Sequence, residues 1–163
     1  MNSKNNQQKE LIEYFLDYLS LERGLAFNTI ISYRYDLCKF YKFIVIKKKI
    51  TFQAVDREIL SKYYHYLNKN QLGINSIFRN LVAIKMFYRF LLTEGYIKED
   101  LARFIEFPKL TKKLPQTLNI MELKKLLDTD NFKGILGKRD QAIIELLYAT
   151  GMRVSELISL KLN

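Results

Sequence analysis

Cysteine and histidine are almost absent from this sequence, where Cys38 and His65 are single examples among 163 residues. One cysteine excludes a disulfide framework within the chain, a pattern typical of proteins kept in a reducing cytosol. One histidine and one distant cysteine also cannot form a zinc site, so we expect no bound metal. Because Cys38 lies inside an apolar helical pattern, we expect its side chain to be buried.

Long apolar segments are missing as well. No run approaches the ~18 apolar residues of a membrane-spanning helix. The polar N-terminus, MNSKNNQQKE, contains no apolar signal region. These two absences predict a cytoplasmic protein that does not interact with a membrane.

Positive charge, by contrast, is in excess. The chain carries 27 Lys and Arg against 17 Asp and Glu, a net charge of +10. Residues 1–110 hold 18 basic and 11 acidic residues, which leaves +7, and residues 111–163 hold 9 and 6, which leaves +3. Such an excess favours a polyanionic partner, nucleic acid before membrane, although solubility alone is a competing explanation.

The first hundred residues are expected to form four amphipathic helices, because apolar residues recur at helical spacing and no segment shows strand alternation. The first helix should cover residues 7–23. The second should follow an N-cap at Asn28, the third should follow Asp56, and the fourth should follow a cap at Asn75 or Ser76.

Glycines are expected to end two of these helices, Gly24 the first and Gly95 the fourth. The lysine run at 47–49 suits the C-terminus of the second helix, where cations complement the helix dipole. One core should collect the apolar faces, formed by Leu11, Phe15, Leu19, Ile30, Tyr33, Leu37, Phe40, Ile44, Ile59, Leu60, Tyr63, Leu67, Ile77, Leu81, Ile84, Tyr88 and Leu91.

Both prolines, Pro108 and Pro115, bracket the segment PKLTKKLP, which predicts an extended and basic linker. Beyond it, Asn119 and Glu122 have the spacing of a capping box at the start of a helix. The segment GKRDQAIIELLYAT predicts another helix, whose Tyr148 we expect to be buried.

A charged arginine at the start of a new helix, in YATGMRVSEL, is the least generic feature of the chain. The guanidinium of Arg153 offers a fork of donors that matches two phosphate oxygens, and a helix N-terminus adds backbone N–H groups. Glu156 lies three residues further on the same helical face and can hold Arg153 in position. From spacing alone, the competing interpretation is an exposed surface ion pair.

Four stretches together resemble the Xer-type tyrosine recombinases of the phage integrase family: NTIISYRYDLCKFYKF, SIFRNLVAIKMFYRFLLTEGYI, FPKLTKKLP and, most specifically, RDQAIIELLYATGMRVSELISLKL. The resemblance implies an all-α chain. Residues 1–107 would form a four-helix, SAM-like core-binding domain that grips DNA. Residues 108–115 would be a basic interdomain linker, and residues 116–163 would be the N-terminal portion of a catalytic domain.

In that family, as the resemblance implies, a tyrosine attacks the scissile phosphodiester and leaves a 3′-phosphotyrosine. Strands are rejoined without ATP, metal or other cofactor. Arg153 matches the first of two catalytic arginines and Glu156 its supporting acidic residue. The implied partners are double-stranded DNA and a second recombinase subunit, with a tetramer on two DNA sites for the full-length protein. The implied role is chromosome dimer resolution, and so chromosome partition, or integration of mobile DNA.

The sequence departs from the family pattern after Arg153. The family's lysine hairpin, its His-x-x-Arg pair and its nucleophilic tyrosine are missing, and His65 is interpreted as a surface or DNA-facing side chain. We therefore expect these 163 residues to bind DNA without cutting it, while the parent protein is an enzyme.

The DNA-contact candidates are exposed polar or basic residues at helix starts, on helix faces and in the linker. Ser and Thr at a helix start more often cap the helix, so Arg34 and Arg79 are the stronger candidates. The full set is Asn28, Thr29, Ser32, Arg34, Asn75, Ser76, Arg79, Asn80, Lys85, Lys109, Lys112 and Lys113.

Two other interpretations stay open at this point. The chain could be a naturally truncated, non-catalytic DNA-binding protein that regulates recombination sites. It could also be a helical protein-interaction module without a role on DNA. Salt-dependent DNA affinity separates the last interpretation from the other two.

Overall fold

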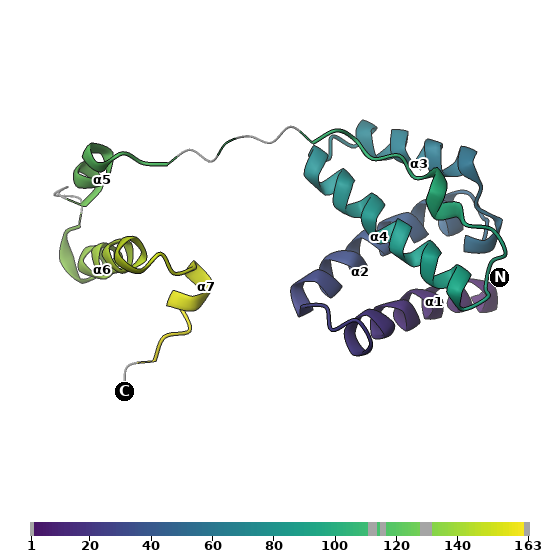
Figure 1. The fold of residues 1–163 in the computed structure, drawn as a ribbon, viewed down its shortest axis with the longest axis horizontal. Coiled ribbons are helices and arrows are strands. Elements are labelled where there is room, and N and C mark those ends of the chain that lie inside the picture. The colour runs from purple at the N-terminus through teal and green to yellow at the C-terminus, as the bar shows by residue number, and fades with distance from the viewer. Residues whose placement is uncertain (1, 111–113, 115–116, 128–131, 162–163) are drawn as a thin grey trace. The chain divides into compact units, whose positions relative to one another are not determined.

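The regular structure of this protein is helical (Figure 1). The computed structural model describes residues 2–110, 114, 117–127 and 132–161, and these residues include no β-strand. The all-α prediction is therefore confirmed. The chain divides into two compact units, Met1–Thr111 and Lys112–Asn163. No helix in the described ranges is both long and apolar enough to cross a bilayer.

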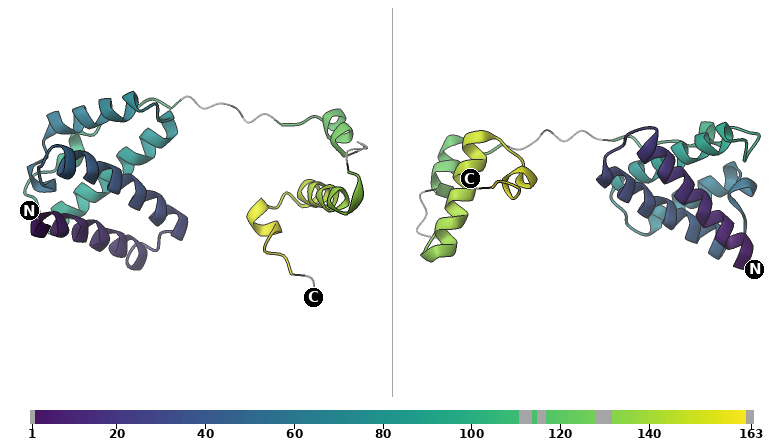
Figure 2. Two further views of the ribbon diagram at one scale, coloured as in Figure 1. Left: turned by 180° about the vertical axis from the view of Figure 1, so that it is seen from behind. Right: turned by 90° about the horizontal axis from the view of Figure 1, so that it is seen from below.

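The described residues of the first unit, 2–110, form four α-helices and three shorter helical segments. Its elements are α1 (Asn2–Leu21), α2 (Phe27–Tyr41), the π-helix η1 (Lys42–Lys47), the 3₁₀ turn η2 (Phe52–Ala54), α3 (Arg57–Lys69), α4 (Ile74–Thr93) and the 3₁₀ turn η3 (Leu101–Phe104). Helix α2 packs against both α1 and α4, and α4 also packs on α3 and η3 (Figures 1 and 2). The four helices predicted from apolar periodicity are thus present.

Two predicted N-caps are wrong. Helix α2 starts at Phe27, one residue before Asn28. Its first carbonyl acceptor is that of Ala26, which receives the N–H groups of Thr29 and Ile30. Helix α4 likewise starts at Ile74, with the Gly73 carbonyl in the capping position instead of Asn75 or Ser76. The cap at Asp56 is confirmed, since its carboxylate accepts the N–H of Ile59 at 2.8 Å.

The predicted helix stops are confirmed at both glycines. Gly24 and Gly95 adopt φ angles of +61° and +73°, a left-handed conformation that other residues rarely adopt. The chain turns at each glycine, and residues after it donate hydrogen bonds to carbonyls of the last helical turn. After Gly95, for example, the Tyr96 N–H donates to the Leu91 carbonyl at 2.8 Å.

The predicted apolar core forms as one cluster, in which only Ile30 and Ile59 of the expected residues are half-buried. Aromatic rings fill its centre, with Phe52 and Phe87 at a centroid separation of 4.8 Å in an edge-on arrangement. The expectation for Cys38 is wrong, because its side chain is exposed. It follows Leu37 on α2 and faces away from the core that Leu37 enters.

Backbone groups of the buried residue Phe52 are bound by side chains from two helices. The Gln8 Oε1 atom, on α1, accepts the Phe52 N–H at 2.7 Å, and the Tyr88 hydroxyl, on α4, donates to the Phe52 carbonyl at 3.1 Å. All three residues are at most 3% exposed. Burial raises the pKa of the Tyr88 hydroxyl, so it remains a donor. The non-helical segment around η2 is therefore anchored to the helical core.

A Gln8→Leu change should destabilise the first unit by about 1–3 kcal/mol, because the buried Phe52 N–H would lose its acceptor without gaining water. Urea unfolding of the 163-residue chain, followed by circular dichroism, measures this loss. Gln7→Leu is the matched control, since Gln7 is exposed and should change stability by less than about 0.5 kcal/mol. Equal midpoints for the two variants would contradict the assignment.

The second unit contains α5 (Ile120–Leu127), α6 (Gly134–Thr150) and α7 (Val154–Leu157). The predicted capping box is confirmed: Asn119 Oδ1 accepts the Glu122 N–H, and Glu122 Oε2 accepts the Asn119 N–H, both at 2.8 Å. The prediction for Tyr148 is wrong, because the residue is 63% exposed. The described residues of this unit place no side chain over that face of α6.

Candidate nucleic-acid interface

Helices α2 and α4 meet at a polar cluster that we call the α2–α4 junction, formed by Asp36, Arg79 and Asn80. Arg79 donates to the Asp36 carboxylate twice, from Nε to Oδ2 at 2.8 Å and from Nη2 to Oδ1 at 3.2 Å. The Asn80 amide donates to Oδ1 at 3.2 Å and to the Asp36 carbonyl at 3.3 Å. The carboxylate is thereby held from both sides.

The three members of the junction differ in their access to solvent. Asp36 is 1% exposed and Asn80 is fully buried, whereas the Arg79 side chain keeps 44% of its surface in solvent. The prediction of Asn80 as a DNA contact is therefore wrong, because its amide serves the protein interior. The hydrogen bond to Asp36 raises the pKa of the Arg79 guanidinium, which stays charged.

The junction also faces α3 through Tyr63. The Tyr63 hydroxyl and Asn80 Oδ1 are both buried, and neither has a hydrogen-bond partner of good geometry among the described residues. Burial raises the pKa of the Tyr63 hydroxyl, and the nearby Asn80 amide opposes that shift. A neutral hydroxyl beside a free carbonyl oxygen places a donor next to an acceptor.

Most other candidates on α2 and at the start of α4 are at least partly exposed. Asn28 and Asn75 are exposed, whereas Thr29, Ser32 and Ser76 are half-buried. The Ser32 hydroxyl donates to the Asn28 carbonyl at 2.8 Å, so it is engaged with its own helix. Arg34, about half exposed, pairs with Glu13 of α1.

The lysine candidates are placed in part. Lys85 is half-buried, with its ammonium 5.1 Å from the centre of the Phe107 ring. Lys109 is exposed, whereas Lys112 and Lys113 lie outside the described residues. The exposed His65 has its Nδ1 2.9 Å from the Ser61 carbonyl, in agreement with its interpretation as a surface residue. Nowhere in the described ranges do three His, Cys, Asp or Glu side chains gather as metal ligands.

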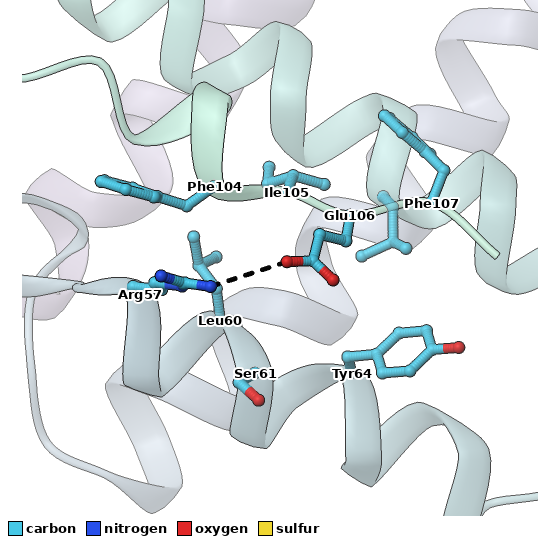
Figure 3. A pocket seen from close by; sticks show the side chains of 9 residues that line it. Arg57, Leu60, Ser61, Tyr64, Phe104, Ile105, Glu106 and Phe107 are labelled. Carbon is cyan, nitrogen blue, oxygen red and sulfur yellow. Dashed lines mark ion pairs between the residues drawn. The ribbon is translucent and has the colours of Figure 1, made fainter.

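A pocket lies between α3 and the segment after η3 (Figure 3). Its floor is apolar, with Leu60 and Ile105, and its rim carries an exposed ion pair between Arg57 and Glu106 at 3.7 Å. The ion pair bridges α3 and the extended residues 105–107, which precede the linker expected at 108–115. Exposed ion pairs of this kind stabilise weakly. Apolar packing therefore contributes most of the attachment between α3 and the segment after η3.

In the second unit, Arg153 stands immediately before α7 and contacts Glu156 in two ways. Its backbone N–H donates to Glu156 Oε2 at 2.8 Å, and its Nη1 donates to Oε1 at 3.0 Å. The Arg153 side chain nevertheless remains 82% exposed. One carboxylate therefore fixes both the backbone and the guanidinium, and leaves donors free to take an anion.

Comparison with known proteins gives this geometry a context. Residues 12–95 match the N-terminal SAM-like domain of phage integrases, and residues 116–163 match the phage integrase family. The chain belongs to the phage integrase family. It is 42% identical over 153 residues to a protein named tyrosine recombinase XerD from Staphylococcus saprophyticus, and 38% identical to one of the same name from Staphylococcus aureus strain Mu50.

Each of these Xer relatives is aligned over 94% of this chain but only 52% of its own length. The chain thus spans about half the length of the curated relatives it matches. Both units of this integrase-family chain are included in the matches, so the resemblance seen in the sequence motifs is confirmed.

Asp36 is the residue that sequence reasoning missed. Asp36 and Asn80 each lie three residues after one core residue and one residue before another: Asp36 between Tyr33 and Leu37, and Asn80 between Ile77 and Leu81. A polar residue inside an apolar stripe is a signal of a buried, paired group. The stripe could have revealed that both residues are buried, but not that they meet.

Proposed function

We propose that this chain provides the DNA-binding part of a site-specific tyrosine recombinase, with 1–107 as the core-binding domain, 108–115 as the linker and 116–163 as the start of the catalytic domain. The observation that supports this most strongly is the match of both units to recombinases of one family. The +7 charge of residues 1–110 and the exposed Arg79 and Arg34 supply a surface for phosphates.

The proposed chemistry is phosphoryl transfer to a tyrosine, with a 3′-phosphotyrosine intermediate and a free 5′-hydroxyl. The bond from phosphorus to the 5′ oxygen breaks as the phosphotyrosine ester forms, so one phosphoester replaces another and rejoining needs no external energy source. Arg153 would stabilise the negative charge that builds on the phosphate oxygens during attack. Glu156 would fix the guanidinium, since its carboxylate accepts both the backbone N–H and the Nη1 of Arg153. We expect the nucleophilic tyrosine and the other assisting groups to come from outside these 163 residues.

The finer assignments belong to the same proposal. We propose that the protein acts in the cytoplasm on double-stranded DNA. We further propose that a second recombinase subunit joins it, with four subunits on two DNA sites during strand exchange. The recombination reaction would resolve chromosome dimers or integrate a mobile element.

Affinity of the 163-residue chain for duplex DNA should fall steeply as salt rises, because lysine and arginine contacts release counterions from the phosphates. A protein that contacts three phosphates loses roughly 40-fold in affinity between 50 and 200 mM salt. Fluorescence anisotropy of a labelled random-sequence duplex measures the slope. An affinity that does not respond to salt, or no binding at all, would refute the proposed function.

A further inference from the structure

We propose that Asp36 is a positioning residue that orients Arg79 to read a guanine in the major groove. This inference rests on the proposed function, since it names how the DNA-binding unit would recognise sequence. Arg79 was expected to contact DNA. The structure adds two observations. The buried Asp36 carboxylate binds one edge of the Arg79 guanidinium, and the other edge of the guanidinium stays free.

The hydrogen bonds use only one edge of the guanidinium. Nε and one N–H of Nη2 point to the two Asp36 oxygens, at 2.8 and 3.2 Å. A guanidinium carries five N–H donors in one plane. The second N–H of Nη2 and those of Nη1 therefore remain, and no described residue receives a hydrogen bond from them. Two of these donors are parallel, at the end of the side chain.

That free end has the geometry of guanine recognition. In the major groove, guanine presents O6 and N7 as two neighbouring acceptors, and arginine satisfies both with two parallel N–H groups. A phosphate also accepts such a fork, but it carries no sequence information. Asp36 accepts from the Nε side of the guanidinium. The two parallel donors on Nη1 and Nη2 at its end therefore stay available for a guanine.

Burial makes the arrangement rigid. Asp36 is 1% exposed and is held by Asn80 as well as by Arg79, so the carboxylate cannot rotate away. A free arginine loses rotamer entropy when it binds DNA, whereas an arginine already fixed in the free protein loses less. The Arg79 side chain is still 44% exposed, so the fixed fork is accessible.

The surroundings of Arg79 favour DNA over a protein partner. Lys39 of α2 lies over the ring of the exposed Tyr35, with 4.9 Å between the ammonium and the ring centre. On α4, Asn75 and Ser76 lie four and three residues before Arg79, on the same helical face. A surface of fixed cations and short polar side chains suits phosphates and base edges.

Selection of bound duplexes from a random-sequence library tests the inference with the intact 163-residue chain. Wild type should recover sequences with at least one strongly preferred guanine. Arg79→Lys keeps the charge that neutralises Asp36 but loses the fork, so preference for that guanine should fall by about 5- to 150-fold. Arg89→Gln is the control, because it removes an exposed charge from the same helix and should leave the preference unchanged.

Two variants test Asp36 itself. Asp36→Asn removes one ionic acceptor while keeping the shape, and Asp36→Glu keeps the charge while moving it by one methylene. Each should reduce the guanine preference more than it reduces binding to scrambled duplex, a difference that a purely structural role would not produce. Binding is measured at a temperature where circular dichroism shows the variant to be folded.

The outcomes distinguish guanine reading by Arg79, the positioning role of Asp36 and the proposed function itself. Salt-dependent binding without any preferred guanine, or a preference that survives Arg79→Lys, overturns the inference and leaves the proposed function intact. A preference that survives in both folded Asp36 variants overturns the positioning role. If Asp36→Asn does not fold, Asp36→Glu and Arg79→Lys decide the matter. No DNA binding by wild type removes the proposed function and the inference together.

Discussion

Replacing Arg153 by alanine should slow DNA strand cleavage by about 10²–10³-fold, the usual loss when one donor to a developing oxyanion is removed. Affinity for duplex DNA should hardly change. The reason is that a fork of donors to the phosphate matters most when negative charge builds in the transition state, so its loss affects rate more than ground-state binding. In the 163-residue chain alone, the same change should leave DNA binding almost untouched.

The measurement has to supply the nucleophilic tyrosine and the other assisting groups, which we propose come from outside these residues. These groups can be supplied by a chimera. In it, residues 1–163 are followed by the second half of the Staphylococcus saprophyticus relative. A DNA substrate that traps the covalent protein–DNA adduct reports the cleavage rate, beside a binding assay. The unmodified chimera has to form adduct before the variant is informative. The isolated 163-residue chain should form none, and adduct from it would show that the nucleophile lies within these residues.

Arg139→Ala is the matched control for this experiment. Arg139 is an exposed arginine on α6 that pairs with the neighbouring Asp140, so its removal takes away the same charge from the same unit. It should leave the adduct rate within a few-fold of the unmodified chimera. Adduct formation at that rate by Arg153→Ala as well would end the catalytic assignment of Arg153.

Glu156 allows a graded version of the test. Glu156→Gln keeps an oxygen that accepts the Arg153 N–H but loses the charge that pairs with the guanidinium. Cleavage should fall by less than with Arg153→Ala, because the arginine is still present but less fixed. A larger loss than for Arg153→Ala would mean that Glu156 has a direct role of its own.

Helix content and the core could be predicted from sequence because both depend on local periodicity. An apolar residue every three or four positions marks the face that must be buried, as along α4 from Ile77 to Leu91. Gly24 and Gly95 mark the ends, because a positive φ is easy only for glycine. The N-caps predicted at Asn28 and at Asn75 or Ser76 were wrong, since α2 and α4 begin after Ala26 and Gly73, which have no polar side chain to signal a cap.

The site was predictable only in part, because its decisive contact joins residues 43 positions apart. Arg79 could be proposed from its type and position, but nothing in the sequence indicates that Asp36 receives it. Asn80 was misassigned because a polar residue was read as exposed, although it falls in the apolar stripe of α4. Tyr148 was misassigned for the opposite reason, since an apolar helix was assumed to have a partner among these residues.

The junction also makes a large prediction about stability. Arg79→Ala should destabilise the first unit by about 3 kcal/mol, because removal of one partner leaves the buried Asp36 carboxylate without its compensating charge. The value is at the low end for buried pairs, since the Asn80 amide still donates to that carboxylate and Arg79 is itself partly exposed. Urea unfolding of the 163-residue chain, followed by circular dichroism, gives the free energy of unfolding.

A double-mutant cycle separates the buried charge from the loss of side-chain packing. In Arg79→Ala combined with Asp36→Asn, the buried group is neutral and no longer needs a cation, so the double variant should be less destabilised than the two single variants summed. Arg34→Ala is the control for removal of an arginine from an ion pair. Its partner Glu13 is exposed, so the cost should stay within about 1 kcal/mol. Additive losses in the cycle would mean that Asp36 gains little from the Arg79 charge, and the fixed guanidinium that the guanine-reading inference requires would then lack its physical basis.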